Sequence, residues 1–207
     1  MDLSQLVRQH GLEIVASLFG VISVYLSARE NIWSWPTALV NVLLSVPVYF
    51  AARLYSDMGL QFVYAALSLY GWYEWLYGGE NRTELPVSRV PRGRIPLLAV
   101  IAVATTALLG TIAWRYTNAS WPNLDATLTA VSLIAQWMMT RKLLENWAIW
   151  IAVDVVYVGM FIYKGLYLTA INYGVYLALA VLGYVAWRRS LATQRTIVEV
   201  PAPELHP

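Results

Sequence analysis

The sequence contains no cysteine and only two histidines among its 207 residues. A disulfide framework, a thiolate metal site and a cysteine nucleophile are therefore excluded, and two histidines in the polar termini cannot build a zinc site. Charge is also scarce, because Lys, Arg, Asp and Glu together make up only 13% of the chain. These charges gather in short clusters instead of covering one face of every helix, as a soluble fold requires. A soluble enzyme domain is therefore excluded.

Apolar residues make up 59% of the sequence and gather in runs long enough to cross a bilayer. A hydrocarbon core about 30 Å thick takes roughly 20 residues of α-helix. The predicted fold class is therefore an all-α polytopic membrane protein with seven transmembrane helices. The formal net charge of +2 is too small to indicate a nucleic-acid partner. The predicted spans are residues 12–28, 33–53, 58–77, 95–114, 124–140, 146–163 and 166–187.

Lys and Arg are unequally divided between the two sides that these spans define. Ten lie on the side of residues 78–94 and the C-terminal tail, whereas four lie on the other side. Since cytoplasmic loops carry the excess of basic residues, we expect an outside N-terminus and a cytoplasmic C-terminus. Residues 78–94 are expected to form a cytoplasmic loop without a domain of its own, and residues 188–207 a disordered cytoplasmic tail.

A weak internal repeat relates the first three predicted spans to the last three. A single span, residues 95–114, separates the two units, which cover residues 12–77 and 124–187. An odd linker helix places both units in the same orientation, so the predicted architecture is two parallel three-helix repeats joined by one linker, or 3+1+3. The pairs at an offset of 112 are Leu54-Tyr55 with Leu166-Tyr167, Tyr64 with Tyr176, Gly71 to Trp75 with Gly183 to Trp187, Leu12 with Leu124, Glu13 with Asp125 and Arg29 with Arg141, while Trp35 pairs with Trp150 after a three-residue shift.

Polar side chains inside the spans are the strongest indication of function, because each costs about 2 to 3 kcal/mol to insert. Asp154 lies near the middle of its span, and Trp150 and Tyr157 share its helical face. A structural ion pair or a protonated core acid is the alternative role for Asp154, and amides can instead bond helices together. Further polar or aromatic candidates are Asn41, Ser68, Gln136, Asn172 and Tyr176, with Trp72, Trp75 and Trp137. Tryptophans near span ends are expected at the membrane interface, namely Trp33, Trp35, Trp114, Trp121 and Trp187.

These side chains suit a small, planar, cationic and hydroxylated solute. Aromatic faces stack a flat ring or a cation, amides read amide and hydroxyl groups, and one acid balances positive charge. The sequence contains no phosphate-binding glycine loop, no zinc-protease motif and no Ser/His/Asp arrangement. Passive transport is therefore the leading class, with no catalytic residue, no metal ligand and no cofactor expected.

Residues 136–176 carry the most specific pattern in the chain, in three stretches. They run from Gln136-Trp137 through Arg141-Lys142 to Glu145-Asn146-Trp147, then from Trp150 to Asp154, then from Tyr163-Lys164-Gly165 to Ala170. Together with Trp72-Tyr73-Glu74-Trp75, this pattern resembles the PnuC family of bacterial nicotinamide riboside transporters. The likeness covers almost the whole chain and includes the three-one-three arrangement of full-length SWEET sugar transporters. It adds Asn146 to the candidates, although Asn146 can instead cap its helix.

The resemblance implies facilitated diffusion of a vitamin B3 precursor across the bacterial inner membrane, supplying NAD biosynthesis, with a cytoplasmic kinase trapping the substrate. Relatives in that family carry thiamine or riboflavin, and Asp154 suits the thiazolium of thiamine as well as the pyridinium of nicotinamide riboside. A proton-coupled carrier, a non-transporting vitamin sensor, a membrane enzyme and a homo-oligomer all stay open. The expected substrate-binding residues are Gln136, Trp137, Asn146, Trp150, Asp154, Tyr157, Asn172, Tyr176, Asn41, Ser68, Trp72 and Trp75.

Overall fold

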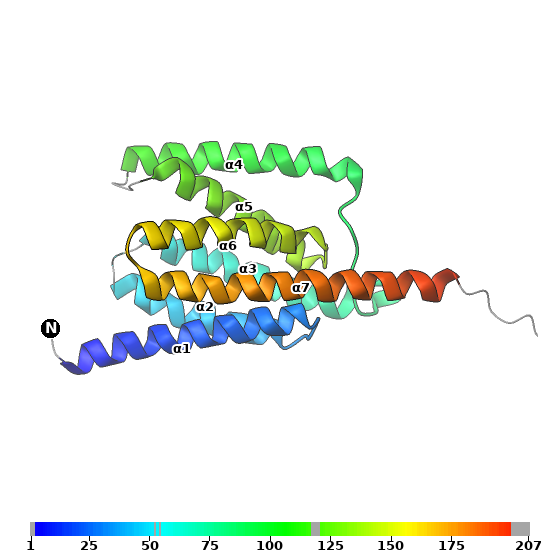
Figure 1. Cartoon of the computed structure of the whole chain (residues 1–207), viewed down its shortest axis with the longest axis horizontal. Helices are drawn as coiled ribbons and strands as arrows, with labels where there is room; N and C mark the ends of the chain where they lie inside the picture. Colours follow the sequence, from blue (N-terminus) through cyan, green and yellow to red (C-terminus); the bar gives the residue numbers. More distant parts are fainter. Residues whose placement is uncertain (1–2, 52, 54, 117–120, 200–207) are drawn as a thin grey trace, which may run out of the picture.

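The computed structural model describes residues 3–51, 53, 55–116 and 121–199, and this part of the chain is all-helical. Its long helices run side by side along one axis (Figure 1). The predicted all-α class with seven helices is therefore confirmed. The helices are α1 (Leu3–Ala28), α2 (Ser34–Ala51), α3 (Tyr55–Tyr77), α4 (Ile95–Tyr116), α5 (Pro122–Thr140), α6 (Glu145–Tyr163) and α7 (Tyr167–Glu199), with the short 3-10 turns η1 (Glu80–Arg82) and η2 (Arg92–Arg94) between α3 and α4.

Five helices in the described part are long and apolar enough to cross a membrane, namely α1, α2, α4, α6 and α7. The other two, α3 and α5, have the length, with 23 and 19 residues, but a more polar sequence. Their polar side chains include Gln61, Ser68 and Gln136, which line an internal cavity described below. A helix that faces a cavity tolerates such residues because they are not exposed to lipid.

Six of the helices form a closed ring in the order α1, α2, α3, α5, α6, α7, because each packs against the next and α7 packs against α1. We call α1–α3 the first unit and α5–α7 the second unit. The fourth helix lies outside this ring and packs against α5, at the edge of the molecule in Figure 1. The two units therefore meet along two seams, α1 with α7 and α3 with α5.

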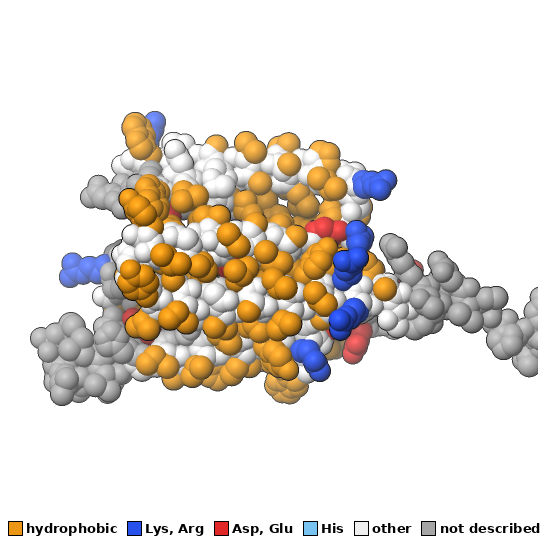
Figure 2. Space-filling view, viewed as in Figure 1, with side chains coloured by type: hydrophobic (Ala, Val, Ile, Leu, Met, Phe, Trp, Pro, Cys, Tyr) orange, Lys and Arg blue, Asp and Glu red, His pale blue; other side chains and the backbone are white. Residues whose placement is uncertain are grey.

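The outer surface of the bundle is mostly apolar, as Figure 2 shows for one face. Leu168 and Val103, for example, are 85% and 70% exposed, as expected for side chains that contact lipid. Lys and Arg side chains gather near one end, on the right in Figure 2. We call this the basic end; it holds residues 29–33, 78–94 and 141–144.

Four buried tryptophans form the core at the basic end. Trp35 meets Trp75 edge to face with ring centroids 5.3 Å apart, and Trp147 meets Trp187 in the same way at 5.4 Å. Trp75 and Trp187 also contact each other at 5.9 Å, which joins the two units. The interfacial positions predicted for Trp35 and Trp187 are therefore wrong, whereas Trp33 and Trp114 are exposed. The counterpart of Trp35 in this cluster is Trp147, at an offset of 112 and without the predicted three-residue shift.

The described part of the tail differs from the prediction of disorder after residue 187. Residues 188–199 continue α7, which is 33 residues long and reaches beyond the basic end (Figure 1). Helix formers such as Leu191, Ala192 and Gln194 favour this continuation, and the prolines that suggested disorder begin only at Pro201. Residues 200–207 lie outside the described residues.

Two glycines allow the tryptophan cluster to pack. A Cβ atom on Gly183 would lie 2.6 Å from the Trp147 ring, and one on Gly71 would overlap the Trp35 ring. Gly183→Ala and Gly71→Ala are therefore expected to destabilise the protein by about 1 to 3 kcal/mol through overpacking, measured as a lower melting temperature in detergent. The matched controls are Gly174→Ala on α7 and Gly59→Ala on α3, where an added Cβ meets no other atom within 4 Å. Equal losses in all four variants would contradict the packing role.

Candidate functional site

A cavity of about 280 Å³ lies inside the ring of six helices. All six ring helices contribute to its wall, so it lies between the first unit and the second unit. Cavities between helices of a bundle are common ligand sites. The lining residues are Gly20, Ser23, Val24, Ser27, Trp35, Ala38, Asn41, Val42, Gln61, Tyr64, Ser68, Gln136, Met139, Trp147, Trp150, Asp154, Tyr173, Tyr176 and Ala180.

Asp154 supplies the one carboxylate among the described lining residues, and none of them is Lys or Arg. It lies on α6, is 5% exposed, and has no cationic partner among the described residues. A buried charge is costly unless it is paired, so this carboxylate favours a positively charged partner in the cavity. The cavity therefore has the electrostatic character of a cation site.

Aromatic and amide groups surround this carboxylate. Trp150 lies one helical turn before Asp154 on α6, so both side chains reach the cavity from the same face. Gln136 on α5 and Gln61 on α3 bring amides, and Ser68 brings a buried hydroxyl. This set can stack a planar ring, balance a positive charge and hydrogen-bond to amide or hydroxyl groups.

Six of the twelve predicted site residues line the cavity. They are Asn41, Ser68, Gln136, Trp150, Asp154 and Tyr176. Four of them, Asn41, Ser68, Asp154 and Tyr176, lie about half way along their predicted spans, and helix packing brings all six together. The other six, Trp72, Trp75, Trp137, Asn146, Tyr157 and Asn172, are absent from the lining.

Four of the residues outside the lining make other contacts. The Trp75 indole donates a hydrogen bond to the carbonyl of Met139, and Asn146 donates to the carbonyl of Leu143 beside the start of α6. Asn172 accepts a hydrogen bond from Ser17. Tyr157 packs on the lining residue Tyr173, with ring centroids 4.7 Å apart. Trp75 and Tyr157 therefore contact lining residues, whereas the partners of Asn146 and Asn172 are not lining residues.

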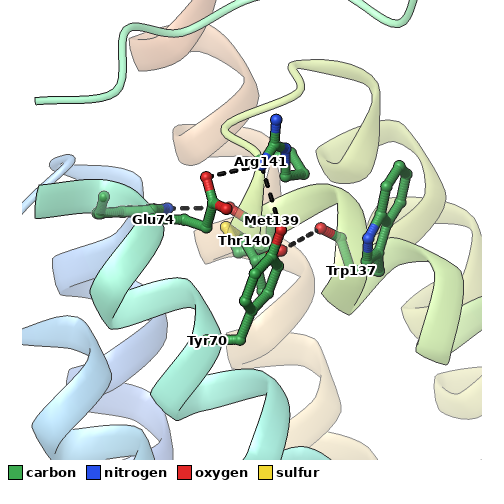
Figure 3. Close-up of polar contacts among 7 residues, drawn as sticks. Tyr70, Glu74, Trp137, Met139, Thr140 and Arg141 are labelled. Carbon is green, nitrogen blue, oxygen red and sulfur yellow. Dashed lines mark hydrogen bonds and ion pairs between the residues drawn. The ribbon is translucent and has the colours of Figure 1, made fainter. Parts of the chain in front are cut away.

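Trp137 and Trp72 also lie outside the cavity. The Trp137 ring points away from Tyr70 and Glu74 in Figure 3, and its backbone carbonyl accepts a hydrogen bond from Thr140. Trp72 packs against the tryptophan cluster as a partly buried neighbour. A tryptophan that shares a helical face with a polar residue does not always line the cavity. The neighbouring helices decide which side of each helix faces inward.

Trp35 and Trp147 are lining residues that the list of candidates omits. Trp35 looked interfacial because it lies near the start of a span, and Trp147 lies in the recognised motif beside Asn146. The signal that could have found both is the offset of 112 that relates them. Tyr173 and Gln61 were also missing from the candidates, although Gln61 is a polar residue inside a predicted span.

Asn41 has a contact in addition to its place in the cavity wall. Its side-chain nitrogen donates to the carbonyl of Ala16, 2.6 Å away on the neighbouring α1. A Cβ on Gly20 would lie 3.1 Å from that nitrogen and 2.5 Å from the Tyr176 hydroxyl, so glycine is needed for α1 to approach both residues. The helix-bonding role that was the alternative for Asn41 is thus present together with cavity lining.

An ion pair at the basic end links the two units. Arg141 lies 2.6 Å from the Glu74 carboxylate and also donates to the Tyr70 hydroxyl at 3.2 Å (Figure 3). Glu145 instead accepts a hydrogen bond from the backbone of Val90.

Neither the Glu74 nor the Glu145 carboxylate lines the cavity. No group of acidic or histidine side chains in the described residues is arranged to hold a metal ion.

Comparison with known proteins identifies one family. Residues 10–189 match the family model described as nicotinamide mononucleotide transporter. The nicotinamide riboside transporter PnuC of Escherichia coli strain K12 is 26% identical over 204 residues, covering 86% of this chain and 85% of that protein. The riboflavin/roseoflavin transporter RibM of Streptomyces davaonensis is 28% identical over 194 residues, covering 90% and 89%.

A solved structure has the same fold. The crystal structure of the vitamin B3 transporter PnuC aligns with a TM-score of 0.69 and 25% identity, covering 88% of this chain and 82% of that chain. The relatives are transporters, which confirms transport and not catalysis as the functional class. The resemblance recognised in the sequence is likewise confirmed.

Thermal stability tests whether Asp154 belongs to a structural ion pair. Because no Lys or Arg side chain in the described ranges pairs with it, Asp154→Asn should leave the melting temperature in detergent nearly unchanged. Glu30→Gln is the contrasting variant, since it strands Lys142, whose side chain is 7% exposed and lies 3.4 Å from Glu30. We expect Glu30→Gln to cost about 1 to 3 kcal/mol. A loss in Asp154→Asn as large as that in Glu30→Gln would identify Asp154 as a structural ion-pair member.

Proposed function

The chain belongs to the family of nicotinamide mononucleotide transporters, and from this membership we propose that it carries nicotinamide riboside across the membrane by facilitated diffusion. The single observation that carries the proposal is the carboxylate of Asp154, which lies inside a cavity between the two units and has no cationic partner in the part of the chain that the structure describes. The pyridinium ring of nicotinamide riboside supplies the missing positive charge, and its carboxamide and ribose hydroxyls match the amides and hydroxyls of the wall.

The charge of the cavity favours the riboside over the mononucleotide. A mononucleotide adds a phosphate, which proteins usually hold with Arg, Lys or a helix N-terminus. The described lining has no Lys or Arg, and Asp154 would repel the phosphate. We therefore propose that substrate enters without phosphate and that a cytoplasmic kinase traps it for NAD biosynthesis.

Riboflavin is the second candidate, because the similar RibM is described as a riboflavin/roseoflavin transporter. Its three-ring system could stack on Trp150 or Trp147, but it is neutral and leaves Asp154 without a counter-charge. Thiamine is a cation, so it suits Asp154 on charge alone. Nicotinamide riboside is preferred because it combines the cation with the substrate named for the PnuC relatives.

We also propose that the two units are parallel repeats in a 3+1+3 arrangement with α4 as the linker. The ring order supports this, since α1 packs on α7 as α5 packs on α3, and a two-fold exchange of the units preserves both seams. Local contacts support it further, because Gly71 faces Trp35 as Gly183 faces Trp147. Parallel repeats with a site between them are one basis of alternating access.

The proposed orientation places the basic end in the cytoplasm of a bacterial inner membrane. The excess of Lys and Arg at that end supports it through the positive-inside rule. The N-terminus would then lie outside, and the long α7 would extend into the cytoplasm. Substrate would enter from the end opposite to the tryptophan cluster.

Binding by the Asp154 variant tests the counter-charge. Asp154→Asn should weaken nicotinamide riboside by roughly 1 to 3 kcal/mol, about 5- to 150-fold, because it removes the charge but keeps the size. The affinity of Asp154→Asn for the neutral dihydro form of the riboside, in which the pyridinium is reduced, should fall much less. Trp150→Ala is the comparison on the same helical face and should weaken both ligands through lost stacking. Equal losses for the two ligands in Asp154→Asn would remove the counter-charge role.

Uptake into liposomes tests the transport mode. Purified protein should bring radiolabelled nicotinamide riboside to equal concentrations on both sides, at the same rate with and without a proton gradient. Binding without uptake would instead support a vitamin sensor, and uptake that stops when the proton gradient is removed would support a proton-coupled carrier.

A further inference from the structure

The cavity is closed at the basic end by the tryptophan cluster. Trp35 from α2 and Trp147 from α6 line the cavity, and behind them Trp75 and Trp187 contact each other between the units. All four side chains are buried. A path that leaves the cavity between Trp35 and Trp147 toward the basic end therefore meets the Trp75 and Trp187 rings.

Two equivalent hydrogen bonds tie this layer across the seams. The Trp75 indole of the first unit donates to the carbonyl of Met139 in the second unit, and the Trp187 indole of the second unit donates to the carbonyl of Ser27 in the first unit, both at 3.0 Å. Donors and acceptors are each related by the offset of 112. Ser27 and Met139 themselves line the cavity, so both bonds lie directly at its floor.

An ion pair lies beyond these bonds. Glu30 and Lys142, also 112 residues apart, meet at 3.4 Å across the two units. The Lys142 ammonium lies 4.6 Å from the centre of a Trp75 ring, which adds a cation–π contact. The backbone of Ser88 exchanges hydrogen bonds with Lys142 and Leu144, so residues 78–94 are held against the same turn. The basic end is thus joined by bonds from both units.

The same layer contains buried polar atoms that lack partners. Within the described part of the chain, the indole nitrogens of Trp35 and Trp147, the Ser34 hydroxyl and the side-chain oxygen of Asn146 have no hydrogen-bond partner. These atoms also form two pairs at the offset of 112. Buried unpaired groups cost free energy, so they oppose the two indole-to-carbonyl bonds and reduce the preference for the closed arrangement.

We propose that Trp75 and Trp187 form a two-fold gate at the basic end of the cavity. In the closed arrangement each indole holds a carbonyl of the opposite unit, and opening breaks both bonds together and frees Ser27 and Met139. Trp35 and Trp147 connect the gate to cavity occupancy, because each contacts the cavity on one side and a gate indole on the other. This inference rests on the proposed function only in treating the cavity as the transport site.

Cysteine labelling tests the gate directly, because the native chain has no cysteine. Ser68→Cys places one thiol in the cavity wall, and a membrane-impermeant maleimide is applied to the basic end in oriented vesicles without substrate. Trp75→Phe and Trp187→Phe keep an aromatic ring but remove one indole donor each. Each is expected to raise the labelling rate from the basic end about 2- to 10-fold, with a similar effect from either residue.

Trp114→Phe on the exposed face of α4 is the matched control and should leave the rate unchanged. Glu30→Gln removes the negative charge of the Glu30–Lys142 pair at the same end and leaves the tryptophan side chains unchanged, so it should change the rate in the same direction. Unchanged labelling in Trp75→Phe, Trp187→Phe and Glu30→Gln would overturn the gate. Because no substrate is present, this result is independent of whether nicotinamide riboside binds, so failure of the gate and failure of the substrate proposal are distinguishable.

Discussion

Four tryptophans pack against one another between the two three-helix units and fix how closely the helices approach at the basic end. Trp35 and Trp147 can approach α3 and α7 only because glycines stand opposite them. That approach brings Trp75 and Trp187 into contact and aligns their indole groups with carbonyls of the opposite unit. The cavity is the space left between the units above this layer. Its floor is therefore set by packing and by directional hydrogen bonds together.

The two units contribute different side chains to the cavity wall, although the four tryptophans form two equivalent pairs. Asp154 of α6 corresponds by the offset of 112 to Val42 of α2, and both line the cavity. Trp150 corresponds in the same way to Ala38. The second unit thus contributes the charge and the stacking ring, whereas the first contributes smaller side chains at those positions. A symmetric frame can move as two halves, and an asymmetric wall can hold an asymmetric solute in one orientation.

Much of this arrangement could be predicted from the sequence, for identifiable reasons. Runs of apolar residues gave the helices, and the cost of a buried charge identified Asp154. The position of Trp35 could not be predicted in the same way, because a tryptophan near a span end is common both at the interface and in a core. Whether such a tryptophan is buried depends on whether a neighbouring helix has a glycine opposite it. That contact joins segments that lie far apart in the sequence. Asn146 makes a contact at the start of α6, as its capping alternative expects, since its side-chain nitrogen donates to the carbonyl of Leu143.

We propose that the Asp154 carboxylate selects a cationic, phosphate-free nucleoside, because the described lining has no Lys or Arg and no described cation pairs with this acid. Equilibrium binding of purified protein to nicotinamide riboside, nicotinamide mononucleotide, thiamine and riboflavin, measured by calorimetry in one detergent, tests it most directly. We expect tight binding of the riboside, with the mononucleotide weaker by at least about tenfold because its phosphate meets Asp154 and no Lys or Arg in the described lining. Binding of the mononucleotide or riboflavin as tightly as the riboside, or micromolar binding of thiamine alone, would contradict it.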